Sequence, residues 1–125
     1  MNIRLIAGYF GGRIIEGSGT TRTHPMGERI RSSLFNILGS EIEGAVVLDA
    51  FAGSGSLGLE SLSRGAKQAT FVERDRVAQK IFERNIALLG VHEQAKLVKA
   101  PVASWLSTVD TQYDIIFADP PYNNL

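Results

Sequence analysis

Apolar runs and amphipathic stretches alternate along most of this chain, and each apolar run has the length of one buried strand. Continuous apolar runs of this kind are typical of parallel strands covered on both faces. The runs predict four strands, at residues 45–50, 68–73, 95–98 and 113–118. The segments between the strands predict three helices. The first begins behind the glycines that follow the first strand and ends at Arg64, the second extends from the N-cap Asp75 to Leu89, and a short third one follows Pro101.

The residues before these strands predict a hairpin and a helix. Residues 2–7 and 12–16 flank a glycine-rich turn and indicate a β-hairpin, and a Gly/Ser/Thr-rich linker follows at 17–23. Residues 27–38 have helical periodicity and end at Gly39, a typical helix stop. The apolar face of this helix is expected to consist of Ile30, Leu34, Ile37 and Leu38.

The first predicted strand ends in an acid and leads into a glycine-rich turn. Asp49 closes the strand, Gly53 and Gly55 follow, and a helix begins behind them. Glycines at these places permit a tight turn and a close approach of the backbone to a ligand. The second strand ends in Glu73, which is placed to accept hydrogen bonds from ribose hydroxyls. This half of the chain therefore predicts a nucleotide-binding fold.

The charge of the turn helps to choose the nucleotide. Gly53, Gly55 and Gly58 satisfy the dinucleotide pattern G-x-G-x-x-G, which keeps an NAD-dependent enzyme open as an alternative. Asp49, however, would lie where a pyrophosphate binds a helix N-terminus, and two anions repel each other. S-adenosylmethionine has no phosphate and carries an ammonium and a sulfonium, which a carboxylate attracts. Asp49 therefore favours a methyl donor over NAD.

The last apolar run delivers a second group of candidate residues, Asp119-Pro120-Pro121-Tyr122. The Asp119 carboxylate can accept a hydrogen bond from an exocyclic amine, and the prolines hold their carbonyls in fixed directions because their φ angles are locked. Tyr122 offers a ring on which a base can stack. Taken alone, the motif leaves open a strand followed by a Pro-Pro turn with no ligand. Together with the glycine turn, it favours binding of a flat group that bears an amine.

Composition narrows the class of protein without selecting a partner. A chain of 125 residues is the size of one domain, and its 13 basic and 13 acidic residues leave no net charge. There is no cysteine, the 2 histidines have no ligand spacing, and no apolar run could span a bilayer. We therefore expect no metal, no membrane and a cytoplasmic location. Arginines outnumber acids before Leu34, which indicates either contacts to phosphates or a solvated cationic hairpin.

These motifs, in this order, resemble the Rossmann-like S-adenosylmethionine-dependent methyltransferases, and more narrowly the 16S rRNA (guanine-N2)-methyltransferase family. The resemblance also covers the N-terminal hairpin and the helical stretch 23–38. It implies an α/β fold in which a largely parallel sheet, with strand order 3-2-1-4, carries helices on both faces beside an N-terminal β-hairpin. One domain is expected over 1–125, with the hairpin and linker in 1–23 and the cofactor-binding core in 24–125.

The resemblance further implies methyl transfer from S-adenosylmethionine to the N2 amine of a guanine, with 16S rRNA or a small-subunit ribonucleoprotein as partner. Asp119, Pro120 and Tyr122 would be catalytic. In many relatives an acid after the third strand contacts the adenine amine of the cofactor. This sequence has no acid there, so a backbone group near Val102 would have to make that contact. The residues expected to bind the cofactor are Asp49, Phe51, Gly53, Gly55, Glu73, Arg74 and Val102. The residues expected to bind the substrate are Arg29, Arg31 and Pro121.

The family's sheet has seven strands, whereas this sequence stops soon after the fourth. We therefore expect the C-terminal strands of the full fold to be missing, and the strand at 113–118 to have an exposed edge. The chain would be a fragment, a truncated product, a monomer or a chain that pairs with its own copy through that edge. Two further functions stay open: a DNA adenine-N6 methyltransferase, which shares D-P-P-Y, and a truncated non-catalytic module that binds S-adenosylmethionine or RNA.

Overall fold

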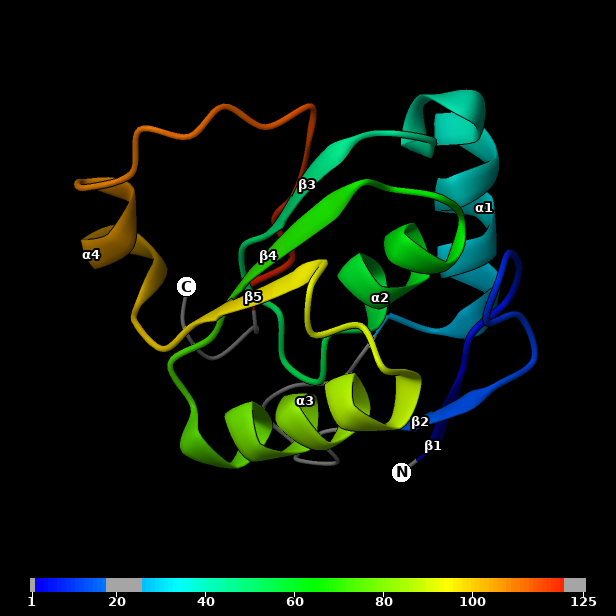
Figure 1. Cartoon of the computed structure of the whole chain (residues 1–125), viewed down its shortest axis with the longest axis horizontal. Coiled ribbons are helices and arrows are strands. Elements are labelled where there is room, and N and C mark those ends of the chain that lie inside the picture. Colours follow the sequence, from blue (N-terminus) through cyan, green and yellow to red (C-terminus); the bar gives the residue numbers. More distant parts are fainter. Residues whose placement is uncertain (1, 18–25, 121–125) are drawn as a thin grey trace.

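The structure is a computed structural model that describes residues 2–17 and 26–120. Strands and helices alternate after an N-terminal pair of short strands, as the sequence pattern predicts (Figure 1). In chain order the elements are β1 (Asn2–Arg4), β2 (Ile14–Glu16), α1 (Glu28–Leu38), the 3-10 helix η1 (Gly39–Ile42), β3 (Val46–Asp49), α2 (Ser56–Ser63), β4 (Gln68–Val72), α3 (Arg76–Leu89), β5 (Ala95–Val98), α4 (Val102–Leu106) and β6 (Ile115–Phe117). The last strand is shorter than the expected 113–118.

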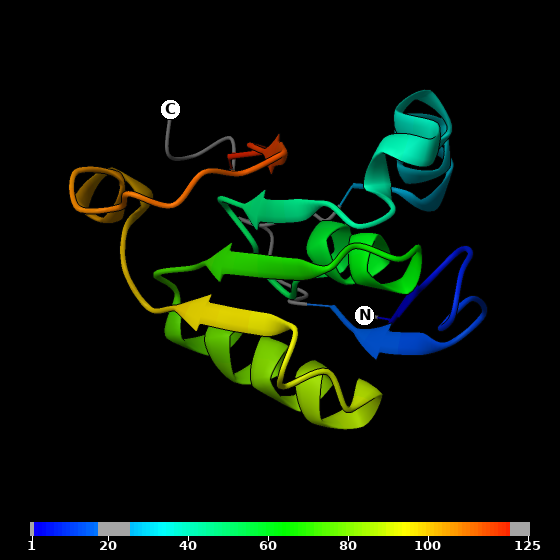
Figure 2. The ribbon, with the colours of Figure 1, turned by 45° about the horizontal axis from the view of Figure 1, so that its top comes forward.

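Strands β3 to β6 form one parallel sheet in the order β5-β4-β3-β6, which confirms the predicted strand order. Figure 2 shows β3, β4 and β5 side by side and pointing the same way. The chain adds β4 and β5 on one side of β3 and then returns to add β6 on the other. Ligands of open parallel sheets bind outside the carboxyl ends of the strands at such a switch point. The topology therefore predicts a ligand site at the carboxyl end of β3.

One face of the sheet packs against α1, α2 and α3. Val47, Phe71 and Phe117 belong to this layer and are almost completely buried. The close approach of α2 requires glycine at Gly58, because a Cβ there would overlap the Phe71 ring. Helix α3 contributes Phe82, whose ring centroid lies 4.4 Å from that of Phe71. Glycine in α2 thus brings the helix, and with it the glycine turn, close to β4.

Helix α1 packs partly with a different face from the one expected. The leucines of the predicted face are partly buried against the core. Ile30 and Ile37, however, are 62% and 82% exposed. The structure buries Arg31 and Phe35 instead. This face of α1 is buried partly because Arg31 forms an ion pair with the buried Glu60 of α2.

The opposite face of the sheet is covered less completely. Leu48 and Val72 are buried there against α4, the only helix of the described residues on this side. Trp105 of α4 packs with its ring centroid 6.2 Å from that of Tyr113. Ile116 of β6 alternates with two core residues, so it faces this side, and it is 60% exposed. Helices therefore lie on both faces, as predicted, but unequally.

Glu60 fastens the N-terminal hairpin to α2. Its side chain is fully buried and accepts hydrogen bonds from the N–H groups of Ile6 and Ala7, at 2.9 and 3.1 Å. Arg31 and Arg64 donate to the same carboxylate, at 3.2 and 2.9 Å. A buried charge needs such partners, since an unpaired one costs several kcal/mol. The hairpin strands are shorter than expected, although Leu5 still exchanges backbone hydrogen bonds with Gly12 and Arg13 beyond their ends.

Candidate functional site

Three acids meet at the carboxyl ends of three adjacent strands. Asp49 is the last residue of β3 and lies opposite Phe71 of β4 and Phe117 of β6. Glu73 follows Phe71 by two positions, and Asp119 follows Phe117 by two positions. The two acids therefore flank Asp49. This fold brings together the two motifs that are far apart in the sequence, and we call Asp49, Glu73 and Asp119 the acid edge.

Asp49 is the buried member of the acid edge, with 3% of its surface exposed. Its Oδ2 accepts a hydrogen bond of 3.0 Å from the Gly58 N–H in the first turn of α2. Burial raises the pKa of the Asp49 carboxyl to about 7; the Gly58 hydrogen bond opposes this rise, and the charges of Glu73 and Asp119 add to it. A cation placed beside such a carboxyl would favour its ionised form. The group therefore suits a positively charged ligand.

Glu73 holds the backbone of the turn in place. Its Oε1 accepts a hydrogen bond of 2.7 Å from the Gly53 N–H, and its Oε2 accepts one of 2.8 Å from the Asp75 N–H. Asp75 in turn caps α3 by accepting a hydrogen bond from the Ala78 N–H. A carboxylate has about four lone-pair positions. Glu73 therefore keeps acceptor capacity for a ligand hydroxyl while it fixes the turn.

The glycines of the turn have different roles. Gly55 has φ of 92° and lies against Phe82, where a Cβ would come within 2.6 Å of the ring. Gly53 has φ of 59°, and a Cβ there would meet no atom within 4 Å. Gly55 is thus required by packing, whereas Gly53 faces open space where a ligand can approach the backbone.

Asp119 and Pro120 are exposed where the chain leaves β6. The end of β6 is fixed to the segment after β3, because the Ala50 N–H donates to the Phe117 carbonyl at 2.9 Å. The exposed carboxylate of Asp119 is therefore carried on a fixed strand end and is free to meet a substrate. Pro121 and Tyr122 lie outside the described residues.

Three further expected cofactor residues come from loops that follow the strands. Phe51 follows β3, Arg74 follows β4, and Val102 begins α4 after β5. Phe51 and Val102 are half-buried in one apolar cluster, and Arg74 is exposed. The structure therefore brings all three to the carboxyl side of the sheet, with an apolar wall beside the acid edge.

The expected substrate contact by Arg31 is wrong for this structure. Only 2% of Arg31 is exposed, and its guanidinium donates to Glu60 and to the Arg4 carbonyl. Arg4 itself pairs with Glu28 at 2.7 Å. Arg29 is exposed on α1. Two N-terminal arginines thus pair with acids of this chain, Arg31 in the interior and Arg4 at the surface. Local sequence patterns cannot reveal such pairs, because the partners are far apart in the sequence.

Sequence reasoning missed Asn85, which holds the turn from behind. Its amide donates to the carbonyls of Ser54 and Glu16, at 3.0 and 2.9 Å, and its oxygen accepts from the Glu16 N–H. The signal was present, since Asn85 is a polar residue on the apolar face of α3 between Phe82 and Leu89. A buried amide needs partners, so such a position indicates a backbone to be fixed.

The described residues contain neither a candidate metal site nor a candidate membrane span. No group of three or more His, Cys, Asp or Glu side chains within residues 2–17 and 26–120 could hold a metal ion. No helix in the same ranges is long and apolar enough to cross a membrane.

Comparison with solved structures defines the class of fold as that of the Rossmann-like methyltransferases. The Escherichia coli protein yhhF superposes with a TM-score of 0.89 and 38% sequence identity, over 99% of this chain and 66% of that one. A protein of Thermus thermophilus superposes with a TM-score of 0.83 and 29% identity, over 97% of this chain and 70% of that one. The predicted fold class is confirmed.

The chain belongs to the family described as "Conserved hypothetical protein 95", whose model matches residues 3–125. Two similar curated relatives are both named "Ribosomal RNA small subunit methyltransferase D". The one from Escherichia coli K12 is 40% identical over 120 residues, which are 96% of this chain and 60% of that protein. The one from Haemophilus influenzae is 37% identical over 124 residues, 97% of this chain and 64% of that protein. The resemblance stated from the motifs is confirmed, although the chain spans only about 60% of the length of the Escherichia coli relative.

Proposed function

We propose that this chain transfers a methyl group from S-adenosylmethionine to the exocyclic N2 amine of a guanine in 16S rRNA. The names of the curated relatives support methylation of small-subunit rRNA. The substrate would be this RNA or a small-subunit ribonucleoprotein, which would place the protein in the cytoplasm. The choice of donor rests on one observation, the buried carboxyl of Asp49 beside an open glycine.

The residues of the acid edge fit the donor's chemistry. Asp49 would attract its positive charge, since the raised pKa of this carboxyl falls when a cation is near. Gly53 would let the donor approach the backbone, and Glu73 would accept hydrogen bonds from ribose hydroxyls. Phe51 and Val102 would supply an apolar wall for a flat ring. A pyrophosphate would instead lie beside three acids and would raise the pKa of the Asp49 carboxyl further, which argues against NAD.

Asp119 would activate the amine of the substrate. An exocyclic amine is a poor nucleophile because its lone pair is delocalised into the ring. The Asp119 carboxylate and the Pro120 carbonyl would accept the two amine hydrogens and so localise that lone pair. Pro121 and Tyr122 would hold the base, the latter by stacking after the base has left its helix or loop. S-adenosylmethionine supplies a methyl group on a sulfonium, so the main task of the protein is alignment.

Calorimetric titration tests this proposal most directly. We expect S-adenosylmethionine to bind and NAD not to bind. Because the Asp49 carboxyl has a pKa of about 7, donor affinity should fall roughly ten-fold between pH 8 and pH 6 as this group takes up a proton. Asp49→Asn, which keeps the shape and an acceptor for the Gly58 N–H, should weaken binding at pH 8 and remove the part of the pH dependence that comes from Asp49. Binding of NAD alone, or donor binding that Asp49→Asn leaves unchanged, would contradict the proposal.

A further inference from the structure

The loop between β1 and β2 holds a large aromatic ring in solvent. Tyr9 is 88% exposed, yet its backbone is fixed. The Tyr9 N–H donates to the Ser63 carbonyl at 2.7 Å, and the Phe10 N–H donates to the Ser63 hydroxyl at 2.9 Å. Gly8 lies so close to Ser63 that a Cβ there would overlap its carbonyl group. The ring is therefore carried on a pre-ordered loop, which lowers the entropy lost when a ligand stacks on it.

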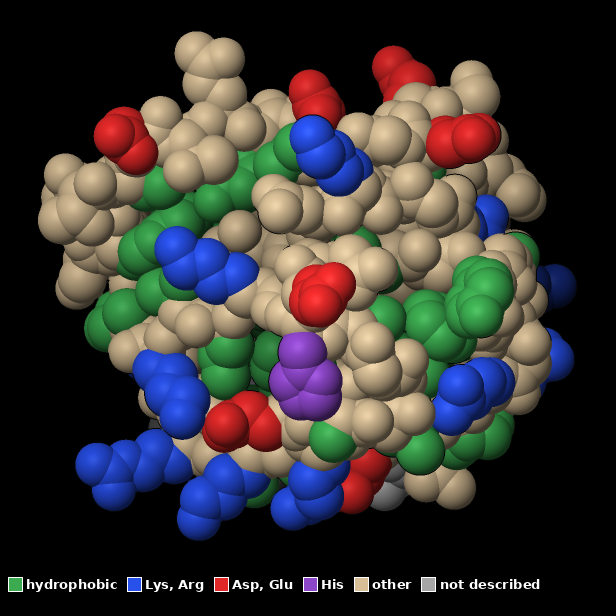
Figure 3. Space-filling model, in the orientation of Figure 1, with side chains coloured by type: hydrophobic (Ala, Val, Ile, Leu, Met, Phe, Trp, Pro, Cys, Tyr) green, Lys and Arg blue, Asp and Glu red, His purple; other side chains and the backbone are tan. Residues whose placement is uncertain are grey.

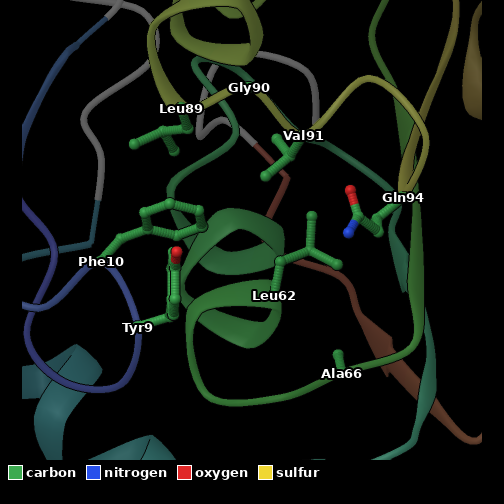
Figure 4. Close-up of a pocket in the computed structure, with 8 residues that line it drawn as sticks. All are labelled: Tyr9, Phe10, Leu62, Ala66, Leu89, Gly90, Val91 and Gln94. Carbon is green, nitrogen blue, oxygen red and sulfur yellow. The ribbon is translucent and has the colours of Figure 1, made fainter.

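A cavity of about 400 Å³ lies beside this ring. Figure 4 shows the rings of Tyr9 and Phe10 on one side, the amide of Gln94 on the other, and Leu62 and Val91 between them. The remaining lining residues are Ala66, Leu89 and Gly90. The volume falls in the range of small-molecule sites, about 300–1,000 Å³. We call this cavity the Tyr9 pocket.

The Tyr9 pocket combines the chemical groups that recognise a heterocyclic base. Tyr9 offers a face for stacking, and the Gln94 amide can both donate and accept hydrogen bonds at a base edge. The guanidinium of Arg13, which is exposed, lies 5.8 Å from the centroid of the Phe10 ring. An apolar side chain of a protein partner would leave the Gln94 amide without a hydrogen-bond partner.

Positive charge extends from the pocket along the neighbouring helix. Figure 3 shows Lys and Arg side chains in a row at the lower edge of the molecule, over α3. The exposed cations of this helix are Arg76, Lys80 and Arg84, of which Arg84 is paired with Glu16 at 2.6 Å. Such a row attracts phosphates, which supply much of the affinity of proteins for nucleic acids. Arg76 and Lys80 on this helix therefore offer positive charge to the phosphates of an RNA.

We propose that the Tyr9 pocket binds an unpaired base of the RNA substrate, which stacks on Tyr9 and hydrogen-bonds to Gln94. The inference rests on the proposed function, because it takes RNA as the substrate. The base in this pocket is not the one that is methylated. The pocket is a second contact that holds the RNA in register while another base reaches Asp119.

The position of the pocket supports the assignment of the two RNA contacts to two separate sites. Ala66 and Gln94 precede β4 and β5, so the pocket lies at the opposite end of the sheet from the acid edge. Helix α3, with 14 residues, joins the two ends and is about 21 Å long. The two contacts are therefore several nucleotides apart along an RNA strand. Only an RNA of this length or more can use both.

The test compares three variants in titrations with a single-stranded oligoribonucleotide that carries 2-aminopurine, a base whose fluorescence falls when it stacks. Tyr9→Ala should lower RNA affinity by about five-fold or more and abolish the fluorescence change. Tyr9→Phe keeps the ring and should bind like the unchanged chain. Ile37→Ala, which removes an apolar side chain 82% exposed on α1, is the matched control and should have no effect.

Equal RNA affinity of Tyr9→Ala and the unchanged chain would overturn the inference, as would an equal loss in Ile37→Ala. The melting temperature of Tyr9→Ala should be unchanged, because the ring is exposed. Titration with S-adenosylmethionine separates the two proposals. Donor binding without any effect of Tyr9 on RNA would leave the proposed function standing and remove the pocket. RNA binding that depends on Tyr9, without donor binding, would support the Tyr9 pocket and contradict the proposed function.

Discussion

The burial of Asp49 suits the binding of a cation, but it makes the unliganded fold less stable when the carboxyl is ionised. Burial raises the pKa of its carboxyl from 3.8 to about 7 in the folded chain. The folded state therefore holds this proton more tightly than the unfolded state does. The stabilising effect is complete below about pH 4, and it is lost as the pH rises toward 7. Above pH 7 the folded state must carry a buried charge that the unfolded chain leaves in water.

Asp49→Asn should accordingly stabilise the unliganded chain at high pH. The shift between 3.8 and about 7 corresponds to a free energy on the order of 4 kcal/mol at pH 8. We expect the melting temperature of Asp49→Asn to exceed that of the unchanged chain at pH 8, and the difference to shrink toward pH 4. Thermal melts of both chains across this range measure the difference directly, and other acids cancel in the comparison. A difference that does not vary with pH would show that Asp49 is not buried as an ionised group.

Asp119 differs from Asp49 because it is exposed, and this difference separates binding from catalysis. Asp119→Ala should abolish methylation of rRNA, since the amine would lose the acceptor that localises its lone pair. Affinity for S-adenosylmethionine should stay within a few-fold, because Asp49, Gly53 and Glu73 keep their contacts. Parallel calorimetry and methyl-transfer assays provide the measurement. A comparable loss of both activities would refute this assignment of roles.

At the scale of elements, Glu60 connects the hairpin, α1 and α2. Glu60→Gln should destabilise the chain by about 3–5 kcal/mol, because Arg31 would remain buried without a counter-charge. The N–H groups of Ile6 and Ala7 should also exchange hydrogen faster, since the neutral side chain has fewer acceptors. Urea denaturation and hydrogen exchange measure these effects.

Glu83→Gln is the matched control for that change. Glu83 pairs with Lys99 at 3.4 Å, and both side chains are more than half exposed. Exposed pairs contribute little because water screens them. The control should therefore leave the denaturation midpoint almost unchanged. Equal destabilisation by the two substitutions would mean that Glu60 is not the buried connector described here.

The elements themselves followed largely from local sequence, because strands and helices have different apolar periods. Asp75 was predicted as the N-cap of α3 and Leu89 as its last residue, and both occupy those places in the structure. The exposure of Ile30 and Ile37 was not predictable, since it depends on the pairing of Arg31 with Glu60, which lies in another helix. The roles of Pro121 and Tyr122 stay predictions. Periodicity thus predicts which segments are helices, but it does not predict where a buried charge redirects one.

At the scale of the whole molecule, the two ends of the sheet have different chemistry. The carboxyl end carries the acid edge, which the strand order made predictable from Asp49, Glu73 and Asp119. The other end carries the Tyr9 pocket, which no sequence motif indicated. Its lining comes from three separate segments of the chain, around Phe10, Leu62 and Val91. Helix α3 joins the two ends, so one long substrate can contact both.

The outer edge of β6 leads to a prediction about association. Within residues 2–17 and 26–120, β6 pairs only with β3, and its Ile116 is 60% exposed. Exposed apolar edge strands pair readily with other strands. We therefore expect this 125-residue chain to self-associate with increasing concentration, as measured by light scattering or sedimentation. Ile116→Lys should shift the chain toward the monomer, because charge on an edge strand opposes pairing. Ile37→Lys, on the exposed side of α1, should not; if it acts equally, general apolar exposure rather than the β6 edge drives association.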